Sequence, residues 1–201
     1  MKTRSRFLFV VLATLGVTTL VARAEAKKPA PAAAGATAAP PRAFQTDFLL
    51  QLDDVQKKIL SLEDAVPADK FKWRPAAGVR SIAEAYLHIA FGSYGLTKAA
   101  TGKEPPADAG WEMNIAKWDA KTTDKAEIKK ILEKSFEFVR SAIADVQDAD
   151  LDKKVKFFGH EMTERAVFMG LIGHLNEHMG QEVAYARSNG VVPPWSKTPG
   201  N

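Results

Sequence analysis

The chain has 201 residues, of which 46% are hydrophobic and 26% charged, and it contains no cysteine. This composition excludes collagen-like, wholly disordered and disulfide-scaffold proteins. The lack of cysteine also excludes zinc fingers, thiol redox motifs and cysteine nucleophiles, so histidine and carboxylate side chains must hold any metal.

The formal net charge of +4 has its origin at the N-terminus. Four of the 28 Lys and Arg residues lie in residues 1–24, which contain no acidic residue, and the other 24 balance the 24 Asp and Glu. A neutral remainder has no overall attraction for phosphate polymers. We therefore expect no binding to nucleic acid.

Residues 1–24 have the pattern of a secretory signal peptide. Three basic residues precede the uncharged run 7–21, and the small-x-small cleavage sequence Ala22-Arg23-Ala24 follows. The run is shorter than the roughly 20 apolar residues of a membrane-spanning helix, so we expect cleavage rather than anchoring. Cleavage after Ala24 or Ala26 would export the protein to a periplasm or the cell exterior, with no membrane association afterwards.

Residues 25–42 form an Ala/Pro-rich linker. The sequence KKPAPAAAGATAAPPR within it has repeated prolines and no apolar periodicity, which is typical of a flexible tether. We expect the folded domain to occupy residues 43–201. No repeat of about 20–50 residues occurs there, so a solenoid is not expected.

Four segments of this domain have the hydrophobic periodicity of amphipathic helices. The first (Phe44 to Leu62) and the third (Asp124 to Val146) carry apolar residues at alternating spacings of four and three. The second begins at the capping box Ser81-Ile-Ala-Glu84 and runs to about Ala100. The fourth runs from near Thr163 to Asn189-Gly190. This pattern predicts an all-α fold, a four-helix bundle.

Two connections between these segments allow more than one interpretation. Residues 154–162 alternate weakly, which fits a short hairpin or a loop. Residues 101–122 form a long connection that contains Trp111 and Trp118. Long connections are often lids or binding loops, but the two Trp side chains could equally fix this one to the bundle.

The inward face of the fourth segment changes from apolar to polar halfway along. It comprises Val167, Leu171, His174, His178, Gln181 and Tyr185. His174 and His178 are one helical turn apart, a spacing that lets two imidazoles reach one ion. His88 lies on a face of small and apolar residues in the second segment. Three imidazoles from two helices can hold Zn²⁺ or Ni²⁺ and leave a position open for water or substrate.

The alternative is that these histidines are ordinary hydrogen-bonded core residues, which is the usual situation for a single buried His. Three inward-facing histidines with no obvious buried acid to pair them are harder to satisfy without a cation. We therefore predict a divalent metal site formed by His88, His174 and His178. His160 is expected to be a surface residue outside this site.

Several further residues lie close to the predicted ligands. Glu84, Glu177 and Glu182 could accept a hydrogen bond from a metal-bound imidazole, although a solvated helix face is the simpler expectation for each. Gln181 could hold a metal-bound water. Tyr185 fits the core better than the site.

The motifs around these histidines resemble those of a known family. The run His174-Leu-Asn-Glu-His178-Met-Gly-Gln181, with Pro193-Pro194 beyond it, looks like the C-terminal helix motif of the DinB-like proteins. The upstream Trp73-Arg74-Pro75, followed by Ser81-Ile-Ala-Glu84 and His88, resembles the second-helix motif of that family. One departure is Val79-Arg80, where related sequences often have an aromatic residue.

This resemblance covers most of residues 43–195 and carries expectations about fold and site. It implies an up-down-down-up four-helix bundle and a divalent metal held by three histidines, which in this sequence are His88, His174 and His178. Some members of the family are thiol-dependent transferases or isomerases. Export would separate this chain from cytoplasmic thiols.

The sequence leaves three functions open. An exported protein with an open metal site could be a metal-dependent transferase or hydrolase acting on a small molecule. It could instead be a non-catalytic metal- or ligand-binding module, or it could keep the metal for stability alone. A fourth ligand from the protein would favour the structural role, and an open position would favour chemistry. The oligomeric state is also open, with a homodimer as one option.

Overall fold

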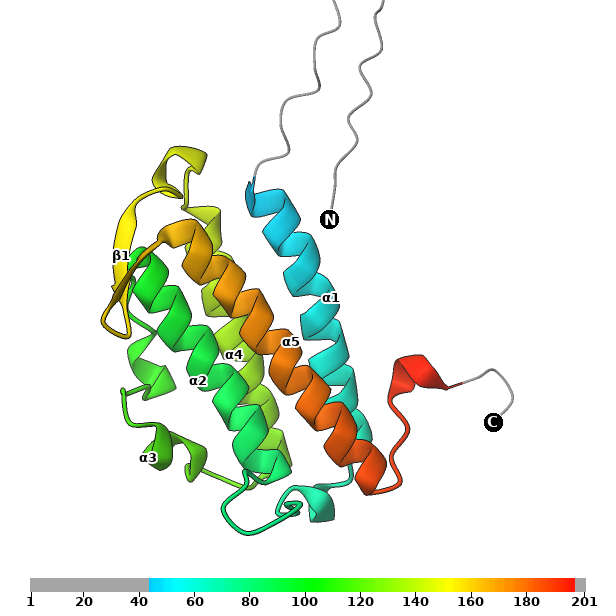
Figure 1. Cartoon of the computed structure of the whole chain (residues 1–201). Helices are drawn as coiled ribbons and strands as arrows, with labels where there is room; N and C mark the ends of the chain where they lie inside the picture. Colours follow the sequence, from blue (N-terminus) through cyan, green and yellow to red (C-terminus); the bar gives the residue numbers. More distant parts are fainter. Residues whose placement is uncertain (1–43, 198–201) are drawn as a thin grey trace, which may run out of the picture. The chain divides into compact units, whose positions relative to one another are not determined.

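The computed structural model describes residues 44–197. The predicted signal peptide (1–24) and linker (25–42) lie outside the described residues and remain predictions. Four long helices form the described domain, as Figure 1 shows: α1 (Phe44–Ala65), α2 (Ile82–Thr101), α4 (Lys125–Ala144) and α5 (Glu164–Ser188). The predicted four-helix bundle is confirmed, and each helix begins close to its predicted position.

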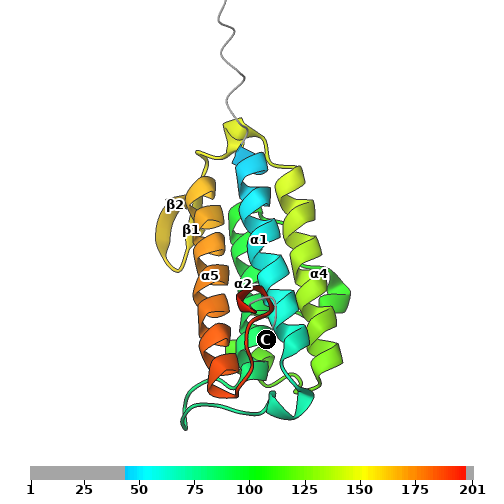
Figure 2. The same ribbon diagram turned by 90° about the vertical axis from the view of Figure 1, so that its right-hand side faces the viewer.

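The helices are arranged in the up-down-down-up order implied by the family resemblance. In Figure 1, α1 and α5 run in one direction, and α2 and α4 run in the other. Helix α2 packs against α4 and α5, and α1 packs against the same two helices. Figure 2 accordingly shows α1 between α4 and α5, with α2 behind it.

The spaced apolar residues of the helices meet in one core. Burial of each large apolar side chain contributes roughly 1.5–3 kcal/mol to folding. The predicted residues of the first and third segments are buried throughout their central turns: Phe48, Leu52, Val55, Ile59 and Leu62 from α1, and Ile128, Leu132, Phe136, Val139 and Ile143 from α4.

Side-chain caps fix where the helices begin. The Ser81 hydroxyl accepts from the Glu84 N–H, and the Glu84 carboxylate accepts from the Ser81 N–H, so the predicted capping box is present. At the starts of α4 and α5, the Asp124 carboxylate and the Thr163 hydroxyl each accept from the backbone N–H three residues later. Each such cap is worth about 1 kcal/mol and fixes the register at which a helix enters the bundle.

The long connection after α2 is fastened to that helix. It contains the short helix α3 (Ile115–Asp119), which packs on α2. The Trp118 indole N–H donates to the Leu87 carbonyl at 2.7 Å, and the Trp111 indole N–H donates to the Phe91 carbonyl at 3.3 Å. Of the two interpretations of these Trp residues, the structure supports the one in which they hold the connection in place.

Residues 154–162 form a hairpin rather than a loop. Strand β1 (Lys154–Phe157) pairs antiparallel with β2 (His160–Thr163), and Phe157 lies opposite His160. The two-residue turn consists of Phe158 and Gly159, both with positive φ, at 47° and 80°. Short 3-10 turns complete the described fold: Ala68–Lys70, Ala107–Ala109, Asp148–Asp150 and Pro194–Ser196. Within the described residues, no helix has the length and apolar character needed to cross a membrane.

Candidate metal centre

Three histidines from two neighbouring helices converge at the middle of the bundle. His88 extends from α2, and His174 and His178 extend from successive turns of α5. One ring nitrogen of each lies within 4.8 Å of the other two. The ring centroids are 4.5–5.1 Å apart and the ring planes are steeply inclined to one another. The structure thus brings together the three residues that the sequence singled out.

Two of the nitrogens have no hydrogen-bond partner within the described part of the chain. Nδ1 of His88 and Nε2 of His174 are both buried. A buried polar atom without a partner costs roughly 1–3 kcal/mol, and a cation coordinated by Nε2 of His174 would remove that cost at this atom. The donor set also suits a divalent ion, since neutral imidazoles are common ligands of Zn²⁺ and Ni²⁺. These residues therefore fit the metal that the family resemblance implies.

Burial keeps two of the imidazoles neutral. Desolvation is the largest influence on His88 and lowers its pKa to about 3, and the positive charge of Arg80 lowers it further. Burial likewise lowers the pKa of His174 to about 4, with His178 adding to the effect. A neutral ring has a nitrogen lone pair free for a metal, so both residues are ready to bind an ion at neutral pH.

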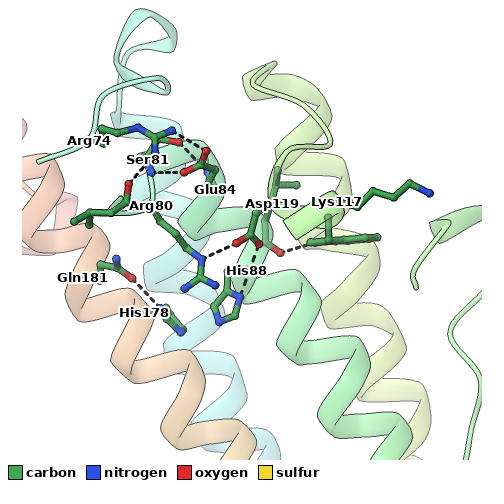
Figure 3. A network of polar contacts seen from close by, with 12 residues as sticks. Arg74, Arg80, Ser81, Glu84, His88, Lys117, Asp119, His178 and Gln181 are labelled. Atoms are coloured by element: carbon green, nitrogen blue, oxygen red, sulfur yellow. Dashed lines mark hydrogen bonds and ion pairs between the residues drawn. The ribbon is translucent and has the colours of Figure 1, made fainter. Parts of the chain in front are cut away.

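A hydrogen-bonded chain orients His178. Its Nδ1 is 2.8 Å from Oε1 of Gln181, and the Gln181 amide donates to the Tyr185 hydroxyl at 2.7 Å (Figure 3 shows the first of these contacts). With Nδ1–H donating to the amide oxygen, Nε2 of His178 keeps a lone pair that is available to a metal. Gln181 therefore contacts a ligand ring directly, whereas the sequence suggested contact with a bound water. Tyr185 is buried, as expected, and its hydroxyl is the last member of this hydrogen-bonded series.

Asp119 is the residue that sequence reasoning missed. It lies at the end of α3, and its Oδ1 is 3.9 Å from Nδ1 of His88, while its Oδ2 accepts from Arg80 at 2.7 Å (Figure 3). Oδ1 is buried without another partner. Burial is the main influence on Asp119 and raises its pKa, and Arg80 opposes this. The sequence offered no obvious acid to pair with the histidines, because this half-buried acid comes from the long connection and not from a helix of the bundle.

Two of the three histidines, His88 and His174, line a pocket of about 450 Å³. One face of α2, from His88 to Ala99, forms its floor, and His174 and Gly170 of α5 form one side. The connection after α2 and the hairpin supply the rest of the wall. A volume of this size lies in the range of small-molecule sites, which are commonly about 300–1,000 Å³.

Comparison with known proteins gives the family. Residues 51–181 match the family model described as the DinB superfamily, which is more than half of the chain. The chain belongs to the DinB superfamily. No curated protein matches it.

Solved structures agree on the fold. A DinB-like protein from Bacillus cereus superposes with a TM-score of 0.63 at 22% identity, covering 74% of this chain and 95% of that one. A DinB-like protein from Bacillus subtilis gives 0.56 at 17% identity, covering 72% of this chain and 92% of that one. At these identities the likeness shows that this DinB member shares their fold.

The three glutamates near the ligands of this DinB member have different environments. Glu177 is exposed, as expected. Glu84 caps α2 and binds Arg74 at 2.7 Å, so it serves the helix start. Glu182 is only 1% exposed, and the expectation of a solvated face was wrong for it. Burial raises the pKa of Glu182 well above its ordinary value, which favours the neutral carboxyl inside the bundle.

His160 remains apart from the metal-ligand group. It is exposed on β2 and is not a member of the His88, His174 and His178 cluster. The expectation of a surface histidine is confirmed, although it stands on a strand and not in a loop. This makes His160 a suitable control for the three candidate ligands.

Proposed function

We propose that this protein is a metal-dependent transferase or hydrolase whose divalent ion, Zn²⁺ or Ni²⁺, is held by His88, His174 and His178. One observation carries the proposal: three histidine nitrogens lie within 4.8 Å of one another, and two of these histidines, His88 and His174, line a pocket. Among the described residues, the cluster that could hold an ion contains these three and no fourth ligand. Three protein ligands and an open position are typical of catalytic rather than structural metal sites.

The residues of the chain would act as ligands and as supports for the ligands. His88 and His174 supply neutral nitrogens, because burial lowers both pKa values. Gln181 holds the ring of His178 by its Nδ1, and Asp119 is placed to accept from His88. A divalent ion at this position would supply Lewis-acid chemistry to a molecule bound in the pocket.

The test is the metal content of matched variants. We expect the wild type to bind one divalent ion per chain, and His88→Ala, His174→Ala and His178→Ala each to lose it. His160→Ala should keep full stoichiometry, because His160 lies outside the cluster. Retention of the ion by all three ligand variants would rule out the assignment.

A non-catalytic metal- or ligand-binding module is the second candidate, and the composition of the pocket favours it. Apart from His88 and His174, Lys156 is the titratable residue of the pocket wall. That wall thus presents no carboxylate, hydroxyl or thiol to act as general acid, base or nucleophile. Turnover that is abolished by a chelator and restored by the ion would select the enzyme, and tight ligand binding without turnover would select the module.

We also propose export, which rests on the basic, apolar and small-residue pattern of residues 1–24. Intact-mass measurement of protein produced with its N-terminus is the test. A mature chain that begins at Glu25 or Lys27 would support export. Detection of the uncleaved chain in a membrane fraction would contradict it.

A further inference from the structure

The wall of the pocket is apolar almost throughout. Successive turns of α2 contribute Phe91 and Leu96, the connection contributes Met113 and Ile115, and the hairpin contributes Phe157 and Phe158. Residues 88 to 99 span three turns of α2, so the floor is about 16 Å long at the helical rise per residue. A floor of this length and composition suits an elongated apolar body rather than a sugar or a nucleotide.

Several large apolar side chains at this pocket are exposed to solvent and do not belong to the core. Phe158 is 80% exposed, Met113 is 69% exposed and Ile115 is 40% exposed. All three line the pocket. Soluble proteins gather exposed apolar residues chiefly where a ligand or partner will cover them.

Phe158 occupies a backbone position that is unfavourable for it. Its φ of 47° lies in the left-handed region, and with Gly159 it forms a two-residue turn of the kind that prefers Asn-Gly. A residue other than glycine is strained in this backbone conformation. Because the Phe158 ring is mostly exposed, its packing offsets little of the strain energy. The placement becomes favourable if the ring covers an apolar molecule in the pocket.

Lys156 and a cation held by the histidines would both attract negative charge to the pocket. Lys156 is exposed on β1, and none of the ion pairs found among residues 44–197 includes it. The other polar residues, His88 and His174, are candidate ligands of a divalent cation. No acidic residue lines the pocket to repel an anion.

We infer that the pocket binds small apolar acids, with an acyl chain or aryl body along α2 and a single anionic group. This inference rests on the proposed function for the metal end of the pocket, but the apolar wall, Phe158 and Lys156 are independent of the ion. The hairpin tip covers the apolar body.

The probes are straight-chain carboxylates from butanoate to dodecanoate, with octanol as the neutral partner of octanoate. Binding is measured calorimetrically on the metal-loaded and the metal-free full chain. Each methylene that enters the pocket should tighten binding about fourfold until the pocket is full. Octanoate should bind at least about tenfold more tightly than octanol to the loaded protein, because hydrogen bonds and ion pairs to a charged group are the stronger ones.

Two glycines of α5 provide a matched pair of variants. A β-carbon at Gly170 or at Gly173 would meet no atom within 4 Å, but Gly170 lines the pocket and Gly173 does not. Both Gly170→Leu and Gly173→Leu should fold, since leucine favours a helix more than glycine does. We expect Gly170→Leu to weaken octanoate binding by about tenfold or more through the lost pocket volume, and Gly173→Leu to leave it unchanged.

Two further variants test the hairpin and the charge. Phe158→Asn suits the turn and should fold, yet it should weaken octanoate binding several-fold, whereas His160→Asn on the same hairpin should not. Lys156→Met should reduce the preference for octanoate over octanol by about threefold, the effect of an exposed ion pair.

The outcomes separate this inference from the proposed function. Chain-length-dependent binding by a protein that never takes up a metal would overturn the proposed function and support the pocket. A metal-loaded protein that binds no carboxylate at millimolar concentration would overturn the pocket and leave the metal site standing. Equal affinities of Gly170→Leu and Gly173→Leu would also overturn it.

Discussion

The imidazole of His174 lies directly against Gly92 of α2, in the space that a β-carbon would occupy. A β-carbon built on Gly92 would overlap three atoms of the ring, and even the most distant of them, Cε1, would be only 2.8 Å away. Glycine at this position therefore allows α2 and α5 to approach closely enough for His88 and His174 to share one site.

The first prediction concerns this contact. Gly92→Ala should keep the fold, since alanine is the better helix former by about 1 kcal/mol, but it should displace the His174 ring. We expect metal affinity to fall about 10- to 100-fold, the effect of disturbing a supporting contact. Competition with a chromogenic chelator measures it. Gly173→Ala, with open space at its β-carbon, is the control and should bind as the wild type does.

The second prediction concerns the acid beside His88. Asp119→Asn removes the negative charge that Arg80 and His88 face, and we expect metal affinity to fall about tenfold or more. Asp108→Asn is the control, because Asp108 lies in the same connection and binds exposed Lys134. If Asp119→Asn retains wild-type affinity, Asp119 serves only to hold Arg80.

The third prediction concerns the orientation of His178. Gln181→Ala frees the ring to rotate and to take either tautomer, so metal affinity should fall about tenfold. Tyr185→Phe removes only the hydroxyl to which the Gln181 amide donates, so it should lower metal affinity less. Asn176→Ala serves as the comparison on the same helix, because the Asn176 amide bonds only the carbonyl of Ile172. Similar losses in Gln181→Ala and Asn176→Ala would point to a general effect on α5.

The fourth prediction concerns pH and the buried Glu63 of α1. Burial is the main influence and raises its pKa from 4.5 to about 7, so the folded state keeps the proton that the unfolded state releases. Folding stability should therefore be greatest below pH 4.5 as far as this group is concerned, and should decline as the pH rises towards 7. The whole decline amounts to at most about 3 kcal/mol.

Glu63→Gln cannot ionise and should remove that decline. At pH 8 it should be more stable than the wild type by about 2–3 kcal/mol, and near pH 4 the two should be similar. Urea unfolding in the presence of a chelator at both pH values measures this without a contribution from metal binding. The exposed Glu177→Gln should show no such difference between the two pH values. A constant stability gap across pH for Glu63→Gln would disprove the linkage.

The sequence was sufficient for the bundle because local and global signals coincide there. The spaced apolar residues of α1 and α4 are the buried ones, and the capping residues stand where the helices begin. The three histidines were found for the same reason, since two share a helical face and the third lies among small residues. The periodicity of a sequence identifies the residues on the inward face of a helix, whether they are apolar or polar.

The hydrophobic periodicity does not predict the environments of Asp119 and Glu182. Asp119 belongs to a connection whose path depends on the Trp118 anchor, and no spacing rule predicts which helix such a segment will reach. Glu182 was misplaced because the buried face of α5 follows Leu175, His178 and Glu182, whereas the sequence pattern was followed through Gln181 at its edge. One residue of difference on a helix is a rotation of about 100°.

The anchoring of Trp118 to the Leu87 carbonyl has a thermodynamic consequence. Leu87 immediately precedes His88, and Trp118 immediately precedes Asp119, so this hydrogen bond fastens the segment that carries Asp119 beside the candidate ligand His88. The same segment carries Met113 and Ile115 on the pocket wall. Lifting the wall to admit a molecule therefore also loosens the support of the ligand. Pocket occupancy and retention of the proposed ion would then be linked equilibria, in which each weakens the other by the same factor.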